Sequence, residues 1–230
     1  MSVHFTPKAI TFLKGLKRHN DRTWFDERKP VYEQELKAPM LALIEEVNAG
    51  LLKFSPEHVR PAPRIMLRIY RDIRFSSNKA PYKTHISAWW ARQGLEKTSG
   101  GGFYFHLDAN EIHLAGGAYM PEREQLLAIR GHIADHHAAF RKLLTAKKLT
   151  ASMKAMDGQA MARGPKGYAP DHPAMDLLRQ RQWGVSTVLP AEQALQPSLA
   201  KTIVEHFKLA APLVAFLNEP LAAKPRAPIF

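Results

Sequence analysis

The period of the hydrophobic pattern changes along the chain, and this change restricts the fold more than any other feature of the sequence. Residues 32–47 carry apolar side chains at every third or fourth position, which is the spacing of a buried helix face. Residues 64–70 instead place Ile65, Leu67 and Ile69 on one face at a period of two, which predicts a strand. After Pro121 the helical spacing returns. A chain with helices at both ends and strands in its middle third is expected to adopt an α+β fold.

The middle third predicts a central antiparallel sheet of about four strands, flanked by N-terminal and C-terminal helices. Besides residues 64–70, three segments are rich in aromatic, Ile, Thr and Ser residues: 83–92, 102–107 and 111–115. Between the last two, Asp108-Ala109-Asn110 has the composition of a hairpin turn. Gly116-Gly117 is expected to end the sheet.

The N-terminal third predicts two helical regions. Thr6 and Pro7 supply an N-cap and a proline at the first helical position, so we expect a helix over residues 7–18. Asn20-Asp21 predicts a break and a new cap before Trp24. Within the second region, Pro39 predicts a kink or a new helix start, because proline has no amide hydrogen to donate.

The C-terminal half predicts three helices. A helix of at least five turns follows Pro121, and its apolar face carries Leu126, Ile129, Ile133, His137, Phe140 and Leu144. Further helices are expected over residues 173–182 and 198–218, the last with a kink at Pro212. Without a repeat or a long linker, we expect a single α+β domain over residues 1–222, followed by an extended Pro-rich tail over 223–230.

Composition removes several classes of function. The 230-residue chain has no cysteine, which excludes disulfides, thiolate metal sites and cysteine nucleophiles. No apolar run approaches the ~20 residues that a membrane-spanning helix needs, and the N-terminus lacks the pattern of a secretory signal. We therefore expect a cytoplasmic protein with no membrane partner.

Positive charge is concentrated in one part of the sequence. The chain has a formal net charge of +12 from 33 Lys+Arg and 21 Asp+Glu. Half of this excess falls in residues 64–97, where aromatic residues are interleaved with the cations. The cations of this segment are Arg64, Arg68, Arg71, Arg74, Lys79, Lys83, Arg92 and Lys97. The guanidinium group of arginine can form two parallel hydrogen bonds to a carboxylate or phosphate. Asp72 alone cannot neutralise the charges of Arg68, Arg71 and Arg74. A bound anion and a purely structural Arg-Asp network are equally compatible with this pattern.

One segment within this cationic region resembles a known family. Residues 68–82 match the pattern Arg-x-x-Arg-Asp-x-Arg-Phe, a short loop, Asp or Asn, Lys, two residues and Tyr, through Arg68, Arg71, Asp72, Arg74, Phe75, Asn78, Lys79 and Tyr82. This signature is similar to that of an uncharacterised family, domain of unknown function 2461. The resemblance extends over almost the whole chain and implies no established activity. At the position where the signature allows Asp or Asn, this chain has Asn78, and its amide argues against a catalytic acid or metal ligand there.

The signature predicts an anion site at one end of the sheet. Its expected donors are the cations Arg68, Arg71, Arg74, Lys79 and Lys83. Three residues are candidates for proton transfer: Asp72, Tyr82 and His106. For Asp72 an orienting role toward Arg68 or Arg74 is favoured, because neighbouring cations lower the pKa of a carboxylate.

Metal and cofactor motifs are absent from the sequence. His132 and His136 are one helical turn apart, but this segment lacks the glutamate of the HExxH zinc motif. We predict no metal site, and nothing in the sequence specifies a cofactor.

Three functional hypotheses follow. The first is a site for a small phosphorylated or carboxylated ligand, with enzymatic activity undecided. The second is a nucleic-acid-binding protein that uses the basic sheet face, and the third is a structural Arg-Asp network without a ligand. A pocket that carries the signature favours a small ligand, whereas an open basic groove favours nucleic acid. The oligomeric state is not determined by the sequence.

Overall fold

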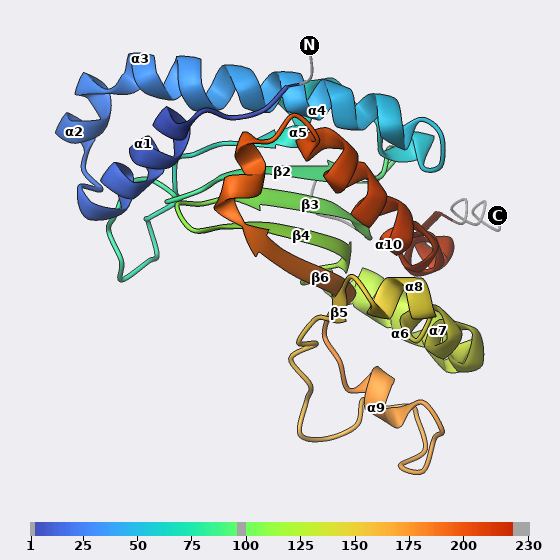
Figure 1. Ribbon diagram of the computed structural model, residues 1–230. Helices are drawn as coiled ribbons and strands as arrows, with labels where there is room; N and C mark the ends of the chain where they lie inside the picture. The colour runs from blue at the N-terminus through green and yellow to red at the C-terminus, as the bar shows by residue number, and fades with distance from the viewer. Residues whose placement is uncertain (1–2, 96–99, 223–230) are drawn as a thin grey trace, which may run out of the picture. The chain divides into compact units, whose positions relative to one another are not determined.

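The computed structural model describes residues 3–95 and 100–222, and it has the predicted α+β architecture (Figure 1). The predicted tail over residues 223–230 and the cation Lys97 lie outside the described residues. The chain divides into two compact units. Unit 1 comprises Met1–Trp90, Tyr104–Leu114 and Thr187–Lys208, and unit 2 comprises Ala91–Phe103, Ala115–Ser186 and Leu209–Phe230. The single domain over residues 1–222 stays a prediction.

The sheet has six antiparallel strands rather than about four, in the order β1-β2-β3-β4-β6-β5. Their bounds are β1 Met66–Leu67, β2 Ile86–Ala91, β3 Gly102–Leu107, β4 Glu111–Ala118, β5 Lys154–Ala155 and β6 Trp183–Pro190. The β3–β4 hairpin turns at the predicted residues. There, Asp108 Oδ1 accepts hydrogen bonds from the amides of Asn110 and Glu111 at 2.7 and 2.8 Å.

The strand predicted over residues 64–70 is largely wrong. Helix α5, Ala62–Ile65, occupies its first part, and β1 retains only two residues. Pro63 fixes a helical φ in the first turn, and the amide of Arg64 donates to the carbonyl of Pro61 at 2.9 Å. A period of two over so few residues cannot exclude one helical turn, because Ile65 and Ile69 are buried in either arrangement.

The prediction that Gly116-Gly117 ends the sheet is also wrong, because β4 continues to Ala118. These glycines allow close packing within the strand. A Cβ at Gly117 would contact the carbonyl oxygen of Trp183 in β6, and a Cβ at Gly116 would lie 2.6 Å from the Cβ of Ala210. The sequence analysis missed β6, although Val185, Thr187 and Leu189 alternate there.

Unit 1 begins with the predicted N-terminal helices: α1 Pro7–Arg18, α2 Arg22–Glu27, α3 Lys29–Val31, the π-helix η1 Tyr32–Lys37, and α4 Ala38–Leu51. Asp21 caps α2 by accepting from the amide of Trp24 at 2.9 Å. The kink or new helix start that was predicted at Pro39 corresponds to the junction between the π-helix η1 and α4. The amide of Ala38 donates to the carbonyl of Glu33, five residues back, because Pro39 cannot donate to the carbonyl of Glu35.

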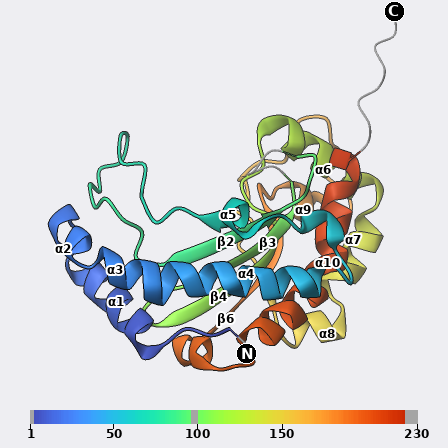
Figure 2. The same ribbon diagram turned by 90° about the horizontal axis from the view of Figure 1, so that it is seen from above.

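Helix α4 covers one face of the unit 1 strands (Figure 2). A polar link joins the two layers: Trp90 Nε1 donates to Asn48 Oδ1 at 3.0 Å, and Asn48 Nδ2 donates to the carbonyl of Arg60 at 2.8 Å. The Trp90 ring also contacts Phe207 edge-on, with centroids 5.3 Å apart. Since Trp90 faces α4, the alternate β2 residue Trp89 points to the opposite face of the sheet. Short 3-10 helices at η2, Pro56–His58, and η3, Ala191–Leu195, complete this unit.

Unit 2 contains α6 Arg123–Asp135, α7 His137–Leu144, α8 Lys147–Thr150 and α9 Met175–Leu178. The predicted five-turn helix is instead two helices, because His136 has the non-helical angles φ −125° and ψ 29°. The break lets both helices reach one ring: the Phe216 centroid lies 4.4 Å from that of His132 and 5.0 Å from that of Phe140. The helix expected over residues 173–182 shrinks to α9, since the chain enters β6 at Trp183.

The last helix, α10, extends from Leu199 to Ala222, four residues beyond the predicted end. Pro212 and Pro220 lie within it. No helix among residues 3–95 and 100–222 is long and apolar enough to cross a membrane.

We expect Gly117→Ala to lower the free energy of unfolding by about 2 kcal/mol, because the added methyl group must displace the backbone of β6. Gly131→Ala is the matched control in α6. A Cβ there meets no atom within 4 Å, and alanine is the better helix former, so stability should rise by about 0.5–1 kcal/mol. Urea unfolding followed by circular dichroism measures both. Equal effects of the two substitutions would contradict the close packing of β4 on β6.

Candidate functional site

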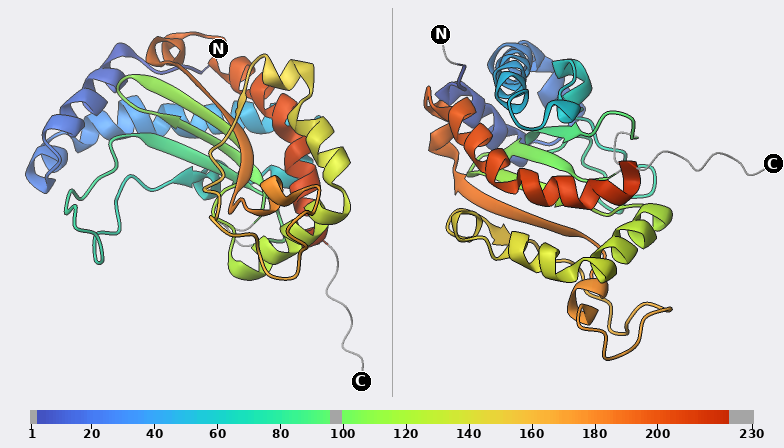
Figure 3. Two further views of the ribbon diagram at one scale, coloured as in Figure 1. Left: turned by 90° about the horizontal axis from the view of Figure 1, so that it is seen from below. Right: turned by 90° about the vertical axis from the view of Figure 1, so that its right-hand side faces the viewer.

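The signature forms a two-stranded ribbon that extends beyond the end of the sheet. The amide of Lys83 donates to the carbonyl of Ile69 at 2.7 Å, the amide of Arg71 donates to the carbonyl of Pro81 at 2.9 Å, and Tyr70 forms a β-bridge with Tyr82. The loop between the two arms projects away from the strands (Figure 1; Figure 3, left). The ribbon therefore brings the two ends of the signature segment together, with Tyr70 opposite Tyr82.

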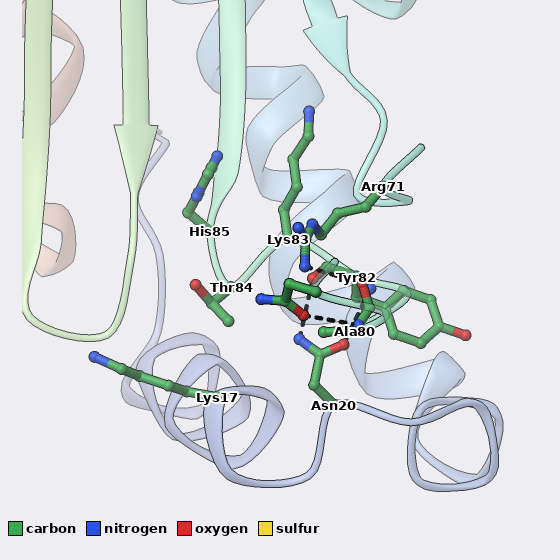
Figure 4. Close-up of a pocket in the computed structure, with 9 residues that line it drawn as sticks. Lys17, Asn20, Arg71, Ala80, Tyr82, Lys83, Thr84 and His85 are labelled. Atoms are coloured by element: carbon green, nitrogen blue, oxygen red, sulfur yellow. Dashed lines mark hydrogen bonds between the residues drawn. The ribbon is translucent and has the colours of Figure 1, made fainter. Parts of the chain in front are cut away.

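A pocket of about 330 Å³ lies at the base of this loop. It is lined by Lys17, Asn20, Arg71, Asn78, Ala80, Tyr82, Lys83, Thr84 and His85 (Figure 4). Asn20 fixes the floor, because its Nδ2 donates to the carbonyl of Tyr82 and its Oδ1 accepts from the amide of Tyr82, both at 3.0 Å. This pair of bonds attaches the ribbon to the end of α1, which carries Lys17.

The pocket lining is cationic. Lys17, Arg71 and Lys83 contribute side chains, and no carboxylate belongs to the described lining. Arg71 is oriented by a bond from its Nη1 to the carbonyl of Ala80 at 3.1 Å. Asn78 Oδ1 accepts from the amide of Ala80 at 2.9 Å and so stabilises the same turn. The site can supply ammonium, guanidinium, hydroxyl and amide donors to a negatively charged group.

Asp72 lies outside the pocket and is paired with Arg74. The two side chains form a bidentate interaction, with Arg74 Nε and Nη2 at 3.0 and 2.8 Å from the two carboxylate oxygens. This hydrogen bonding lowers the pKa of Asp72 to about 2. The Asp72 carboxylate is thus held by Arg74 on the exposed loop. It also keeps its negative charge away from the cations of the pocket.

Of the five cations predicted to bind an anion, only Arg71 and Lys83 line the pocket. Arg74 is paired with Asp72 on the exposed loop. Lys79 Nζ donates to the carbonyl of Ile73 at 3.1 Å and thus closes the loop, while Arg68 is exposed on the ribbon. Lys17, Thr84 and His85 line the pocket but are not among the residues predicted from the sequence. The available clue was Asn20, which marks the end of the helix that carries Lys17.

Tyr82 contributes its backbone to the pocket rather than its phenol. The ring is 3% exposed and stacks on Phe25 at a centroid distance of 4.1 Å. Figure 4 shows it directed away from Lys83 and His85. Burial raises the pKa of Tyr82. In this arrangement the phenol anchors the ribbon to the aromatic core and does not face the pocket.

His106 lies beside a pocket residue in an imidazole cluster, which we define as His85, His106 and His113. The His85 and His106 rings stack with centroids 4.7 Å apart, and His113 meets His106 edge-on at 5.2 Å. Burial, with the neighbouring imidazoles, lowers the pKa of His106 to about 4. Burial also lowers the pKa of His85 and of His113. His106 is therefore neutral at pH 7.

Within the described residues, no group of three or more His, Cys, Asp or Glu side chains is arranged to hold a metal ion. His132 and His136 have ring centroids 4.7 Å apart. His132 Nε2 lies 2.9 Å from Glu219 Oε2, but among the described residues these side chains do not form a metal-binding group.

These features define an α+β protein with a cationic pocket formed by the end of α1 and the signature ribbon. The conserved hypothetical protein family DUF2461 matches residues 8–216, so the chain belongs to that family. No curated protein and no solved structure gives a significant match.

The imidazole cluster predicts an acid-sensitive fold. Because the pKa of His106 is about 4 in the folded state and near 6.5 in an unfolded chain, the unfolded state takes up the proton first as the pH falls. Stability is therefore greatest above pH 6.5 and decreases down to about pH 4, with at most about 3 kcal/mol attributable to His106. Urea unfolding at several pH values should show a smaller decrease for His106→Phe. The exposed His19, changed to Phe, is the control and should leave the decrease intact.

Proposed function

We propose that the pocket binds a small ligand that carries a phosphate or carboxylate group. The observation that carries this proposal is that Lys17, Arg71 and Lys83 all line one pocket whose described lining contains no carboxylate. A bound anion can receive charge-assisted hydrogen bonds from such cations.

The size of the pocket favours a small molecule over a polymer. Its volume of about 330 Å³ lies at the lower end of the range of ~300–1,000 Å³ typical of small-molecule sites. Arg71 supplies a planar fork that suits phosphate or carboxylate oxygens, and its bond to Ala80 holds the guanidinium in place before binding. The proposal concerns binding; a reaction would require a proton-transfer group, and His106 is the candidate adjacent to a lining residue.

We expect Lys17→Ala to weaken the binding of inorganic phosphate about fivefold, because it removes one cation from a solvent-accessible site. Lys14→Ala is the matched control, since Lys14 is exposed on the same helix and does not line the pocket. Arg71→Ala should have a larger effect. Isothermal titration calorimetry at constant ionic strength measures all three. Equal losses for Lys17→Ala and Lys14→Ala would indicate general surface attraction, and absence of saturable binding to the wild type would refute the proposal.

Nucleic-acid binding by the projecting loop is a second candidate, favoured by one observation. Phe75 is 95% exposed at the loop, and the Arg74 guanidinium carbon lies 5.7 Å from the centroid of its ring. Tyr70, on the arm of the ribbon, is also exposed. An exposed aromatic ring beside arginine can stack on an unpaired base while the cation contacts the backbone.

If this second candidate is correct, Phe75→Ala should weaken binding to a labelled single-stranded oligonucleotide about tenfold, because one base-stacking surface is lost. The slope of affinity against salt should stay the same, since no cation is removed. Leu52→Ala, another exposed apolar side chain, is the control. Fluorescence anisotropy measures the affinities, and unchanged binding by Phe75→Ala would exclude stacking on the loop.

A further inference from the structure

The imidazole cluster lies on one face of the sheet, next to the pocket. His85 immediately precedes β2, His106 is in β3 and His113 is in β4. Tyr104, two residues before His106, shares its face because side chains alternate along a strand. The Tyr104 ring meets those of His106 and His113 nearly at right angles, at 5.5 and 6.0 Å. Since His85 also lines the pocket, the cluster and the cationic lining are continuous.

Most ring nitrogens of the cluster are not used by the fold. Within the described chain, His106 Nδ1 pairs with the hydroxyl of Tyr104 at 3.2 Å, and this is the one hydrogen bond of the three imidazole rings. None of the nitrogens of these three rings is among the buried polar atoms without a partner in the described structure. The rings therefore keep hydrogen-bonding capacity that a polar ligand can use.

The chemistry of this surface differs from that of the cationic lining. A neutral imidazole has one donor and one acceptor nitrogen, whereas lysine and arginine only donate. Acceptor nitrogens cannot bond to the oxygens of a fully ionised phosphate or carboxylate. They do bond to hydroxyl groups, which donate and accept in the same way as the rings.

The packing of the rings also distinguishes a ligand that binds through hydrogen bonds from a planar base that binds by stacking. The faces of His85 and His106 stack on each other with an interplanar angle of 25°. Stacking on a planar base needs open ring faces, so the cluster is better suited to hydrogen bonding through its ring edges. A metal ion is disfavoured as well, because these histidines do not form a metal-binding group in the described structure.

We infer that the imidazole cluster extends the pocket into a hydroxyl-recognition surface, and that the ligand is a phosphorylated or carboxylated polyhydroxy compound. This inference rests on the proposed anion-binding function. The anionic end contacts Lys17, Arg71 and Lys83, and the hydroxyl-bearing carbon chain passes His85 toward His106 and His113.

The test compares two ligands that differ in their hydroxyl groups: sorbitol 6-phosphate and n-hexyl phosphate, each with six carbons and one phosphate. Calorimetry at pH 7.5 should give about tenfold tighter binding of the sorbitol compound to the wild type. His106→Phe keeps an aromatic ring but removes both nitrogens, so it should abolish this preference and leave the affinity for inorganic phosphate unchanged. His136→Phe, at an exposed site outside the pocket lining, should behave as wild type.

The outcomes separate this inference from the function on which it rests. Binding of inorganic phosphate without a preference for the sorbitol compound overturns the inference and leaves the anion site intact. A preference that persists in His106→Phe also overturns it. Failure of the wild type to bind inorganic phosphate refutes the proposed function and the inference together. If His106→Phe does not give a folded circular dichroism spectrum, His113→Phe provides the same comparison, because it also removes two ring nitrogens from the cluster.

Discussion

The two hydrogen bonds between the Asn20 side chain and the backbone of Tyr82 are the interaction on which the pocket depends. They join positions 62 residues apart and satisfy both backbone polar groups of one residue. An unsatisfied buried backbone group is costly, so this pairing strongly favours one position of the ribbon relative to α1. The stack of Tyr82 on Phe25 fixes the same residue from its side chain. Together these contacts place Lys17, from a helix, within one pocket with Arg71 and Lys83.

Charge is distributed around this anchor in a consistent way. The acid of the signature, Asp72, is neutralised by Arg74 on the exposed loop and does not enter the pocket. No carboxylate belongs to the described pocket lining, and burial lowers the pKa of the adjoining imidazoles of His85 and His106. A charged wall beside a neutral hydrogen-bonding wall is suited to a ligand with one anionic end and one hydroxyl-bearing end.

The sequence predicts helices and strands well where a hydrophobic spacing repeats over several turns or strand residues, or where a turn has a recognisable composition. The helix at Pro7–Arg18 is confirmed with Pro7 in its first turn, although the Thr6 side chain donates to Glu35 and makes no capping bond. The β3–β4 hairpin is confirmed because Asp108 accepts the bonds of the Asp-x-Asn turn. Prediction failed where neighbours override short patterns. Pro63 converts the start of a supposed strand into α5, Gly117 allows β6 to approach rather than ending β4, and His136 interrupts a helix so that two elements can contact Phe216.

The sequence by itself determined the α+β class, the family and the segment that carries the charge, because period, caps and a spaced signature are local properties. It also predicted the preference of Asp72 for an orienting role, since that follows from adjacent cations. Only the tertiary structure decided which cations share a pocket. Arg71 and Lys83 do so while Arg68, Arg74 and Lys79 do not, because the side chains alternate along the ribbon and the loop carries the others away from it. Lys17, His85 and the two other imidazoles join the site through contacts between residues distant in sequence, which no local pattern encodes.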